Sequence, residues 1–200
     1  NHFNRLGFQT IHGVTAKKLA NTEYHPTSYQ SVYEALFGHE INYKIQSHAY
    51  NNLGEAKGEL IGGNLSIVYS LLGSESAITN PSDKILFLED WFENWYAVDR
   101  MLMNLKRNGI LTHVKGIILG NFTHMDTEEE NADNYNHPFD PKTFEVIYSF
   151  TKKINIPVAF GFPAGHTGHN VALKMGAKVQ LNVTSNNVTL HHYTNKYGTR

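Results

Sequence analysis

The sequence predicts an α/β domain built on a mixed sheet. Three short apolar runs, each bounded by polar or turn-forming residues, are typical of strands buried on both faces: 85–89, 114–119 and 156–160. Helical patterns separate these runs, as in parallel βαβ units. Two further strands are expected at 177–183 and 187–193, and the short polar turn between them predicts an antiparallel hairpin. This hairpin makes the predicted sheet mixed.

The remaining expected elements complete the α/β pattern along the chain. They are a strand at 8–11, a helix at 28–37, strands at 41–47 and 55–60, and helices at 65–72, 98–108 and 143–154. The polar segment 124–141 is longer than an ordinary connection, so it is expected to be a loop. Such a loop could serve as a lid, although a solvated surface loop is the more common case. The penultimate strand is expected to start near Leu173, with Gly176 marking a turn or bulge.

Composition limits the class of protein. The 200 residues are enough for one good core or for one domain with a substantial appendage. Because 17 basic and 18 acidic residues give a net charge of −1 without a Lys/Arg cluster, we expect no nucleic-acid partner. The chain has no apolar run of membrane-spanning length, so no membrane partner is expected, and no signal-peptide pattern, although residues before Asn1 could carry one. The lack of cysteine excludes disulfides and agrees with a cytoplasmic location.

The strongest signal for a site is the run Lys84-Ile-Leu-Phe-Leu-Glu-Asp90. Its apolar part predicts a buried strand, and Glu89 and Asp90 then lie at the carboxyl end of that strand. Open α/β sheets usually build their sites at this edge. A solvated strand end is the alternative interpretation.

A histidine follows a second buried strand in the segment 156–166. The Gly/Pro-rich turn after this strand can present the imidazole of His166 rigidly. If the two strands are neighbours, Glu89 and His166 converge, and a carboxylate that orients a histidine is the base half of a nucleophilic triad. We therefore expect the Glu89 carboxylate and the His166 imidazole to lie about 2.6 to 3.2 Å apart.

Three other features are candidates for substrate binding. Gly62, Gly63 and Asn64 are expected to form a tight turn into a helix, whose backbone N–H groups could hold a carboxylate. The alternative is an ordinary turn in which Asn64 is the N-cap. Trp91 and Tyr96 are aromatic residues that could form the wall of a pocket.

The other histidines give weaker signals. His12, at a strand end, could face the cleft, although such a histidine is more often structural. His166 and His169 are three residues apart, but without cysteine or a predicted helix they lack zinc-site spacing, so no metal is expected. His191 and His192 are expected on opposite sides of the last strand, and exposed.

Six segments, taken together, resemble the LD-carboxypeptidase family of serine peptidases, also called muramoyltetrapeptide carboxypeptidases. They occur in family order and span nearly the whole chain. They are Gly7-Phe-Gln-Thr-Ile-His-Gly13, Gly58-Glu-Leu-Ile-Gly-Gly-Asn-Leu-Ser66, Ile85-Leu-Phe-Leu-Glu-Asp90, Tyr96-Ala-Val-Asp-Arg-Met-Leu102, Gly116-Ile-Ile-Leu-Gly-Asn-Phe122 and 156–166.

The resemblance implies a domain plan. Residues 1–20 would be the tail end of a flavodoxin-like N-terminal domain, 21–52 a linker with a docking helix, and 53–200 a barrel-like swivelling C-terminal domain. The nucleophilic serine of the family lies in a Gly-aromatic-Ser-Asp turn before the segment that matches Gly7 to Gly13. We therefore expect this chain to lack the serine and its oxyanion hole, and to be inactive alone.

The resemblance also implies a function. The intact protein would hydrolyse the amide before the terminal D-alanine of muropeptide tetrapeptides in peptidoglycan recycling, with Glu89 and His166 in the triad and without a cofactor. The expected partners are a muropeptide or other small peptide and the protein's own N-terminal domain, with a homodimer possible. Two departures from the family pattern leave substrate detail open: Val14 replaces a usual proline, and Ala97 replaces a usual arginine.

Two alternative functions stay open. A branch of the same family hydrolyses peptidyl-nucleotide antibiotics for self-immunity, and Trp91 and Trp95 could serve as an aromatic clamp for a nucleotide. From another class, the chain could be a non-catalytic domain that binds a peptide carboxylate. The lack of an evident nucleophile in these residues favours this second alternative for the chain by itself.

Overall fold

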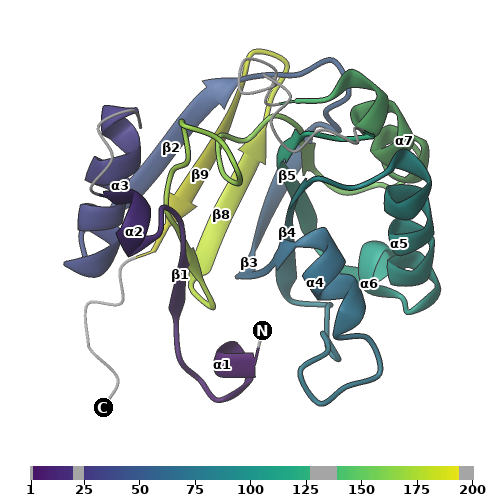
Figure 1. Cartoon of the computed structure of the whole chain (residues 1–200), viewed down its shortest axis with the longest axis horizontal. Helices are drawn as coiled ribbons and strands as arrows, with labels where there is room; N and C mark the ends of the chain where they lie inside the picture. The colour runs from purple at the N-terminus through teal and green to yellow at the C-terminus, as the bar shows by residue number, and fades with distance from the viewer. Residues whose placement is uncertain (1, 20–24, 127–138, 194–200) are drawn as a thin grey trace.

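Figure 1 shows the fold in a computed structural model that describes residues 2–19, 25–126 and 139–193. The helices are α1 (His2–Arg5), α2 (Ala16–Leu19), α3 (Pro26–Leu36), α4 (Leu65–Ser70), α5 (Trp95–Arg107), α6 (Ile110–His113) and α7 (Pro141–Thr151). The strands are β1 (Thr10–His12), β2 (Ile41–Gln46), β3 (Gly54–Asn64), β4 (Lys84–Trp91), β5 (Gly116–Thr123), β6 (Val158–Ala159), β7 (Leu173–Met175), β8 (Lys178–Val183) and β9 (Asn187–His192).

Seven strands form one mixed sheet in the order β2-β9-β8-β3-β4-β5-β6. The strands β3, β4, β5 and β6 are parallel to one another. The pairs β3–β8, β8–β9 and β9–β2 are antiparallel. The prediction of a mixed α/β sheet is therefore confirmed. Outside this sheet, β1 and β7 form a separate antiparallel pair in which His12 lies opposite Leu173.

Strand β4 lies inside the sheet and separates two hydrophobic layers. Leu86 and Leu88 face the helical layer, and Ile85 and Phe87 face the side of β7, β8 and β9. All four side chains are at most 1% exposed. This double burial explains why the run is continuously apolar instead of alternating.

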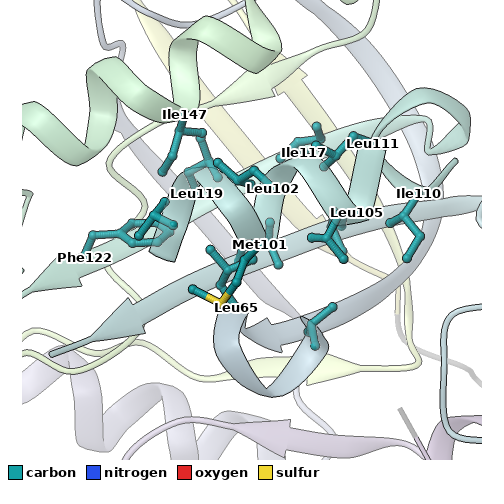
Figure 2. Close-up of a cluster of buried hydrophobic side chains, with 14 of the residues drawn as sticks. Leu65, Met101, Leu102, Leu105, Ile110, Leu111, Ile117, Leu119, Phe122 and Ile147 are labelled. Atoms are coloured by element: carbon teal, nitrogen blue, oxygen red, sulfur yellow. The ribbon is translucent and has the colours of Figure 1, made fainter. Parts of the chain in front are cut away.

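The helices α4, α5, α6 and α7 cover one face of the parallel strands (Figure 1). Val98, Met101, Leu102 and Leu105 recur at helical spacing on α5, and all four are buried. Figure 2 shows Met101, Leu102 and Leu105 in one cluster with Leu119 of β5. The layer anchors the parallel strands from which the site side chains extend.

Gly62 and Gly63 belong to a strand, so the predicted turn before the helix, at 61–64, is wrong. Strand β3 continues to Asn64 and keeps its parallel pairing with β4, with Gly62 opposite Phe87 and Asn64 opposite Glu89. Gly62 has a φ of 115°, and a Cβ added there would lie 2.0 Å from the carbonyl oxygen of Phe87. The glycines therefore allow close backbone contact inside the sheet, and β3 carries Asn64 to the edge that holds Glu89.

Gly176 divides the strand that was expected to run from Leu173 to Val183. Its φ of 82° turns the chain, so the segment forms β7 and β8 in different sheets. Strand β6 is also shorter than the expected 156–160, at two residues. Most of the expected loop at 124–141 lies outside the described residues.

The last strand corrects the expectation for His191 and His192. Side chains alternate across β9, and His192 is fully buried, with its ring edge-on to Tyr43. Burial lowers the pKa of His192 to about 3, and neither of its ring nitrogens has a hydrogen-bond partner. His192 is therefore a neutral core residue, and the prediction that it is exposed is wrong.

The boundary predicted at residue 53 falls between β2 and β3, two strands of the same sheet. After β2 the chain also reaches the far edge of the sheet, where Asn52 bridges Val158 of β6. The domain limits, the barrel-like closure and the flavodoxin-like neighbour stay predictions. Within the described residues, none of the helices combines the length and the apolar character of a membrane span.

Candidate active site

Strand β4 delivers two buried carboxylates to opposite faces of the sheet. Glu89 and Asp90 are each 1% exposed, and as adjacent strand residues they point in opposite directions. Glu89 follows Phe87 on the face of β1, whereas Asp90 follows Leu88 on the face of α4. The two carboxylates therefore have different partners and different environments.

Glu89 and His166 meet as predicted. The Nδ1 atom of His166 lies 2.7 Å from Oε2 of Glu89, so the expected hydrogen bond is confirmed. Burial by itself raises the pKa of Glu89, but hydrogen bonds with His12 and His166 outweigh it, and the pKa is lowered. The hydrogen bond with Glu89 in turn raises the pKa of His166, against the effect of burial. The pair is thus a carboxylate that orients an imidazole and stabilises its charged form.

The turn before His166 requires a glycine. Gly165 has a φ of 135°, and a Cβ there would lie 2.9 Å from Oε2 of Glu89. Its backbone N–H donates to Oδ1 of Asn170 at 3.0 Å, and the hydroxyl of Thr123 donates to the carbonyl of His166 at 3.3 Å. These contacts hold the imidazole at the end of β4 without a helix or strand of its own.

Trp91 lies beside His166, although it is not among the residues that line the cavity at the pair. Its ring is nearly parallel to that of His166, with 5.9 Å between centroids and 20° between planes. The next residue, Phe92, has a φ of 60°, an uncommon conformation for a non-glycine residue. The chain therefore turns sharply just after the indole. A role for Trp91 in binding substrate stays a prediction.

Asp90 uses the donors that were expected to bind a substrate carboxylate. Its Oδ1 accepts from the side chain of Asn64 at 2.6 Å, and its Oδ2 accepts from the backbone N–H of Ser66 at 2.9 Å. The backbone N–H of Ile67 donates to Oδ1 of Asn64, which caps α4. The N-cap alternative for Asn64 is therefore confirmed. Asp90 and Asn64 themselves accept from the N–H groups of Ser66 and Ile67, and a role of Gly62, Gly63 and Asn64 in binding a substrate carboxylate stays a prediction.

Burial raises the pKa of Asp90 to about 6 from 3.8, although hydrogen bonds from Trp91, Asn64 and Ser66 oppose the change. The folded protein thus holds this proton more tightly than the unfolded chain does. The contribution of Asp90 to stability is complete below the unfolded pKa of 3.8 and is lost as the pH rises through about 6.

We therefore expect a pH-dependent difference between the wild type and Asp90→Asn. Between about pH 7.5 and about pH 4, the free energy of unfolding of the wild type should gain roughly 1 to 3 kcal/mol relative to the variant. Denaturant unfolding at several pH values measures this difference. Asp99→Asn, at an exposed position of α5, is the matched control and should follow the wild type. Parallel pH curves for the wild type and Asp90→Asn would contradict the prediction.

A second histidine lies on the free side of Glu89. Nε2 of His12 is 3.5 Å from Oε1 of Glu89, and the His12 ring packs edge-on against Phe87 with 5.0 Å between centroids. The sequence indicated that His12 lies at a strand end, but it did not indicate that His12 approaches Glu89. That approach depends on the pairing of β1 with β7, in which His12 lies opposite Leu173, far away in the sequence. Of the two interpretations of His12, the structure supports the one in which its side chain faces the cleft.

These residues surround a cavity of about 310 Å³. Glu89, His166 and Asn64, all predicted site residues, line it. The other lining residues are His12, Gly13, Val14, Thr15, Lys18, Ile67, Gly165 and Asn170. Much of this wall comes from the segment after β1, which sequence reasoning did not assign to the site.

Tyr96 and His169 lie away from the pair. Tyr96 is 66% exposed and its ring contacts the guanidinium of Arg100, so it is not in the wall of this cavity. Nε2 of His169 lies 2.9 Å from the hydroxyl of Thr27, and its ring packs on that of His25. His166 and His169 thus have separate partners. The described residues contain no group of three or more His, Asp or Glu arranged to hold a metal ion.

A histidine oriented by a buried carboxylate at the carboxyl edge of a parallel sheet is the acid–base half of a nucleophilic hydrolase site. A family model described as "LD-carboxypeptidase C-terminal domain" matches residues 57–181, and the chain belongs to this family. The resemblance stated from the sequence motifs is therefore confirmed.

Relatives and solved structures agree with this assignment. The chain is 32% identical over 181 residues to a probable murein peptide carboxypeptidase of Bacillus subtilis, covering 88% of this chain and 54% of the relative. It is 29% identical over 142 residues to the microcin C7 self-immunity protein MccF of Escherichia coli, covering 71% and 39%. The crystal structure of a muramoyltetrapeptide carboxypeptidase from Oxalobacter formigenes superimposes with a TM-score of 0.74 at 26% identity, covering 93% of this chain and 61% of that one. The chain thus spans about half the length of the curated relatives it matches.

Proposed function

We propose that this chain is the C-terminal catalytic portion of a serine carboxypeptidase. Its reaction would be hydrolysis of the amide before the terminal D-alanine of muropeptide tetrapeptides, as a step of peptidoglycan recycling. The observation that carries the proposal is the 2.7 Å contact of Glu89 with His166 beside an open cavity. Membership of the LD-carboxypeptidase family supports the reaction class.

The geometry assigns a role to each ring nitrogen of His166. Because Nδ1 faces Oε2 of Glu89, it donates its hydrogen to the carboxylate, and Nε2 is left as the base. Nε2 takes the proton of the serine hydroxyl as its oxygen bonds to the substrate carbonyl, and later gives that proton to the departing amine of D-alanine. Water then attacks the acyl carbon and loses a proton to Nε2. The bond to the serine oxygen breaks, Nε2 returns that proton to the serine oxygen, and the shortened peptide leaves as a carboxylic acid.

The nucleophile in this proposal comes from outside the 200 residues. Near the site, the hydroxyls of Ser66 and Thr167 already donate inside the protein, to Asn64 at 2.6 Å and to Asn121 at 3.0 Å. The hydroxyl of Thr15 lies on an exposed residue of the cavity wall, and among the described residues no base is hydrogen-bonded to it. We propose that the N-terminal domain of the same protein supplies the serine and the oxyanion hole, and that residues 1–200 alone are inactive. That domain and a small peptide are the proposed partners, and a homodimer stays a prediction.

A panel of three substrates tests the function with the full-length protein. The substrates are a stem tetrapeptide that ends in D-alanine, the same peptide ending in L-alanine, and an aminoacyl-nucleotide conjugate, with release of the terminal group measured for each. We expect cleavage of the D-alanine peptide with a kcat/KM at least tenfold above that of its epimer. The reason is that the wrong epimer, when bound, would leave polar groups of the pocket without hydrogen-bond partners. Equal cleavage of both epimers would contradict the LD specificity.

Preference for the nucleotide conjugate would instead support the second candidate, self-immunity by hydrolysis of a peptidyl-nucleotide antibiotic. One observation favours this candidate: the half-buried indole of Trp91 lies nearly parallel to the ring of His166, and an aromatic base could stack on such a surface. Similarity to MccF supports it at the level of the family. Cleavage of none of the three substrates by the full-length protein would leave the third alternative, a non-catalytic peptide-binding domain.

A further inference from the structure

Glu89 has one carboxylate oxygen for each of two histidines. Oε2 lies 2.7 Å from Nδ1 of His166, and Oε1 lies 3.5 Å from Nε2 of His12. The carboxylate is 1% exposed, so these two rings replace the water that would otherwise solvate it. The mechanism proposed above uses only His166, and His12 has no assigned role.

His12 is held in place by the pairing of its strand and by contact with the sheet. Its strand, β1, pairs with β7, and its ring packs edge-on against Phe87, which precedes Glu89 on the same face of β4. The side chain is 24% exposed, so it is packed more tightly than a surface histidine. The pairing of β1 with β7 and the contact with Phe87 therefore hold the ring beside Oε1 of Glu89.

The environment of Nδ1, the other ring nitrogen of His12, indicates that Nε2 carries the hydrogen that faces Glu89. Nδ1 is buried and has no hydrogen-bond partner. A hydrogen on Nδ1 would be a buried donor without an acceptor, which is unfavourable, whereas a hydrogen on Nε2 points at the carboxylate. The geometry thus favours a ring whose hydrogen is on Nε2. Such a ring supplies a dipole to Oε1 and leaves the negative charge of Glu89 for the imidazolium of His166.

We infer that His12 is a positioning residue for the reaction, acting through Glu89 to fix the carboxylate and to moderate its effect on His166. The inference rests on the proposed function. Among the described residues, the other charged groups that act on His166 are Asp90, which turns to the opposite face of β4, and Lys18, whose charge opposes protonation of His166. Neither of them can replace the contact at Oε1.

Three variants of the full-length protein separate this role from simple packing. His12→Phe keeps the ring against Phe87 and removes the donor. His12→Gln removes the ring and can place an N–H near the former Nε2, whereas His12→Asn is too short to reach Oε1. For His12→Phe we expect kcat to fall roughly tenfold with little change in KM, as for loss of one charge-assisted hydrogen bond that acts in the transition state. His12→Gln should recover most of the lost rate, and His12→Asn should not.

The pH dependence gives a readout that packing alone would not move. Without the dipole at Oε1, Glu89 is a stronger base and holds the proton of His166 more firmly. In His12→Phe the acid limb of the kcat/KM profile should therefore move to higher pH by several tenths of a unit or more, and His12→Gln should return it toward the wild type. Equal loss in all three variants without movement of the limb would overturn the inference.

A second measurement separates the inference from the proposed function. The titration of the His166 ring can be followed by NMR in the full-length protein without any substrate. A midpoint that rises in His12→Phe supports the positioning role even if the substrate panel shows no turnover. A midpoint that is the same in the wild type, His12→Phe and His12→Gln would overturn it, whatever the protein hydrolyses.

Discussion

Replacing Glu89 by Gln in the full-length protein should lower kcat by roughly 10³- to 10⁴-fold, as loss of the orienting carboxylate does in other nucleophilic triads. The amide has the shape of the carboxylate but no charge, and one of its two ends is a donor that cannot accept from Nδ1 of His166. His166→Ala should cost at least as much, because it removes the base itself. Steady-state kinetics with the preferred substrate of the panel measure both effects. His39→Gln, at an exposed histidine, is the matched control and should keep full activity.

The two changes at the carboxylate should move the pH profile in opposite directions. In Glu89→Gln the imidazolium of His166 loses its counter-charge, so the acid limb of the residual activity should move to lower pH. In His12→Phe, as argued above, it should move to higher pH. An acid limb in Glu89→Gln that stays where it is in the wild type, or a loss of less than tenfold, would contradict the assigned role of Glu89.

Gly62→Ala should be the most destabilising single methyl addition in the sheet. The added Cβ would lie 2.0 Å from the carbonyl oxygen of Phe87, which is backbone and cannot move aside, and the φ of 115° is itself unfavourable for alanine. We expect a loss of roughly 3 to 5 kcal/mol in the free energy of unfolding, measured with denaturant, or failure to fold.

Gly63→Ala is the control for this prediction. Its φ of 131° carries similar conformational strain, but a Cβ there has no neighbouring heavy atom within 4 Å. Its cost should stay at roughly 1 to 3 kcal/mol. Equal losses for the two variants would show that strain alone, and not contact with β4, explains the need for glycine at position 62.

The contact between Glu89 and His166 could be predicted from the sequence because both residues follow buried strands. A continuous apolar run from Ile85 to Leu88 indicated an internal strand, and internal parallel strands bring their carboxyl ends to one edge. The prediction named Glu89, but the apolar pattern alone does not distinguish Glu89 from Asp90. That choice depends on which face of β4 lies against the helices, and a strand buried on both faces carries no alternation from which to determine it.

Other parts of the site depend on contacts that leave little local trace. Strand β1 has three residues and pairs only with β7, so nothing near His12 in the sequence indicates its approach to Glu89. Gly62 and Gly63 have the composition of a turn, and only the nearness of β4 explains them as strand residues. The helix start at 64–66 had the composition of an open anion site, and the sequence did not indicate that Asp90 accepts hydrogen bonds there from Asn64 and Ser66.

The position of β3 in the sheet affects how the chain can fold during synthesis. On one side β3 pairs with β4, which follows soon after it, but on the other side it pairs with β8, whose residues lie more than a hundred positions further on. While the ribosome makes the segment between them, that side of β3 is an uncovered sheet edge beside a nearly complete helical layer. Pairings of such long range also fold slowly. Nascent chains are therefore exposed to wrong association until the hairpin of β8 and β9 emerges, and assistance by chaperones at that stage would have its largest benefit.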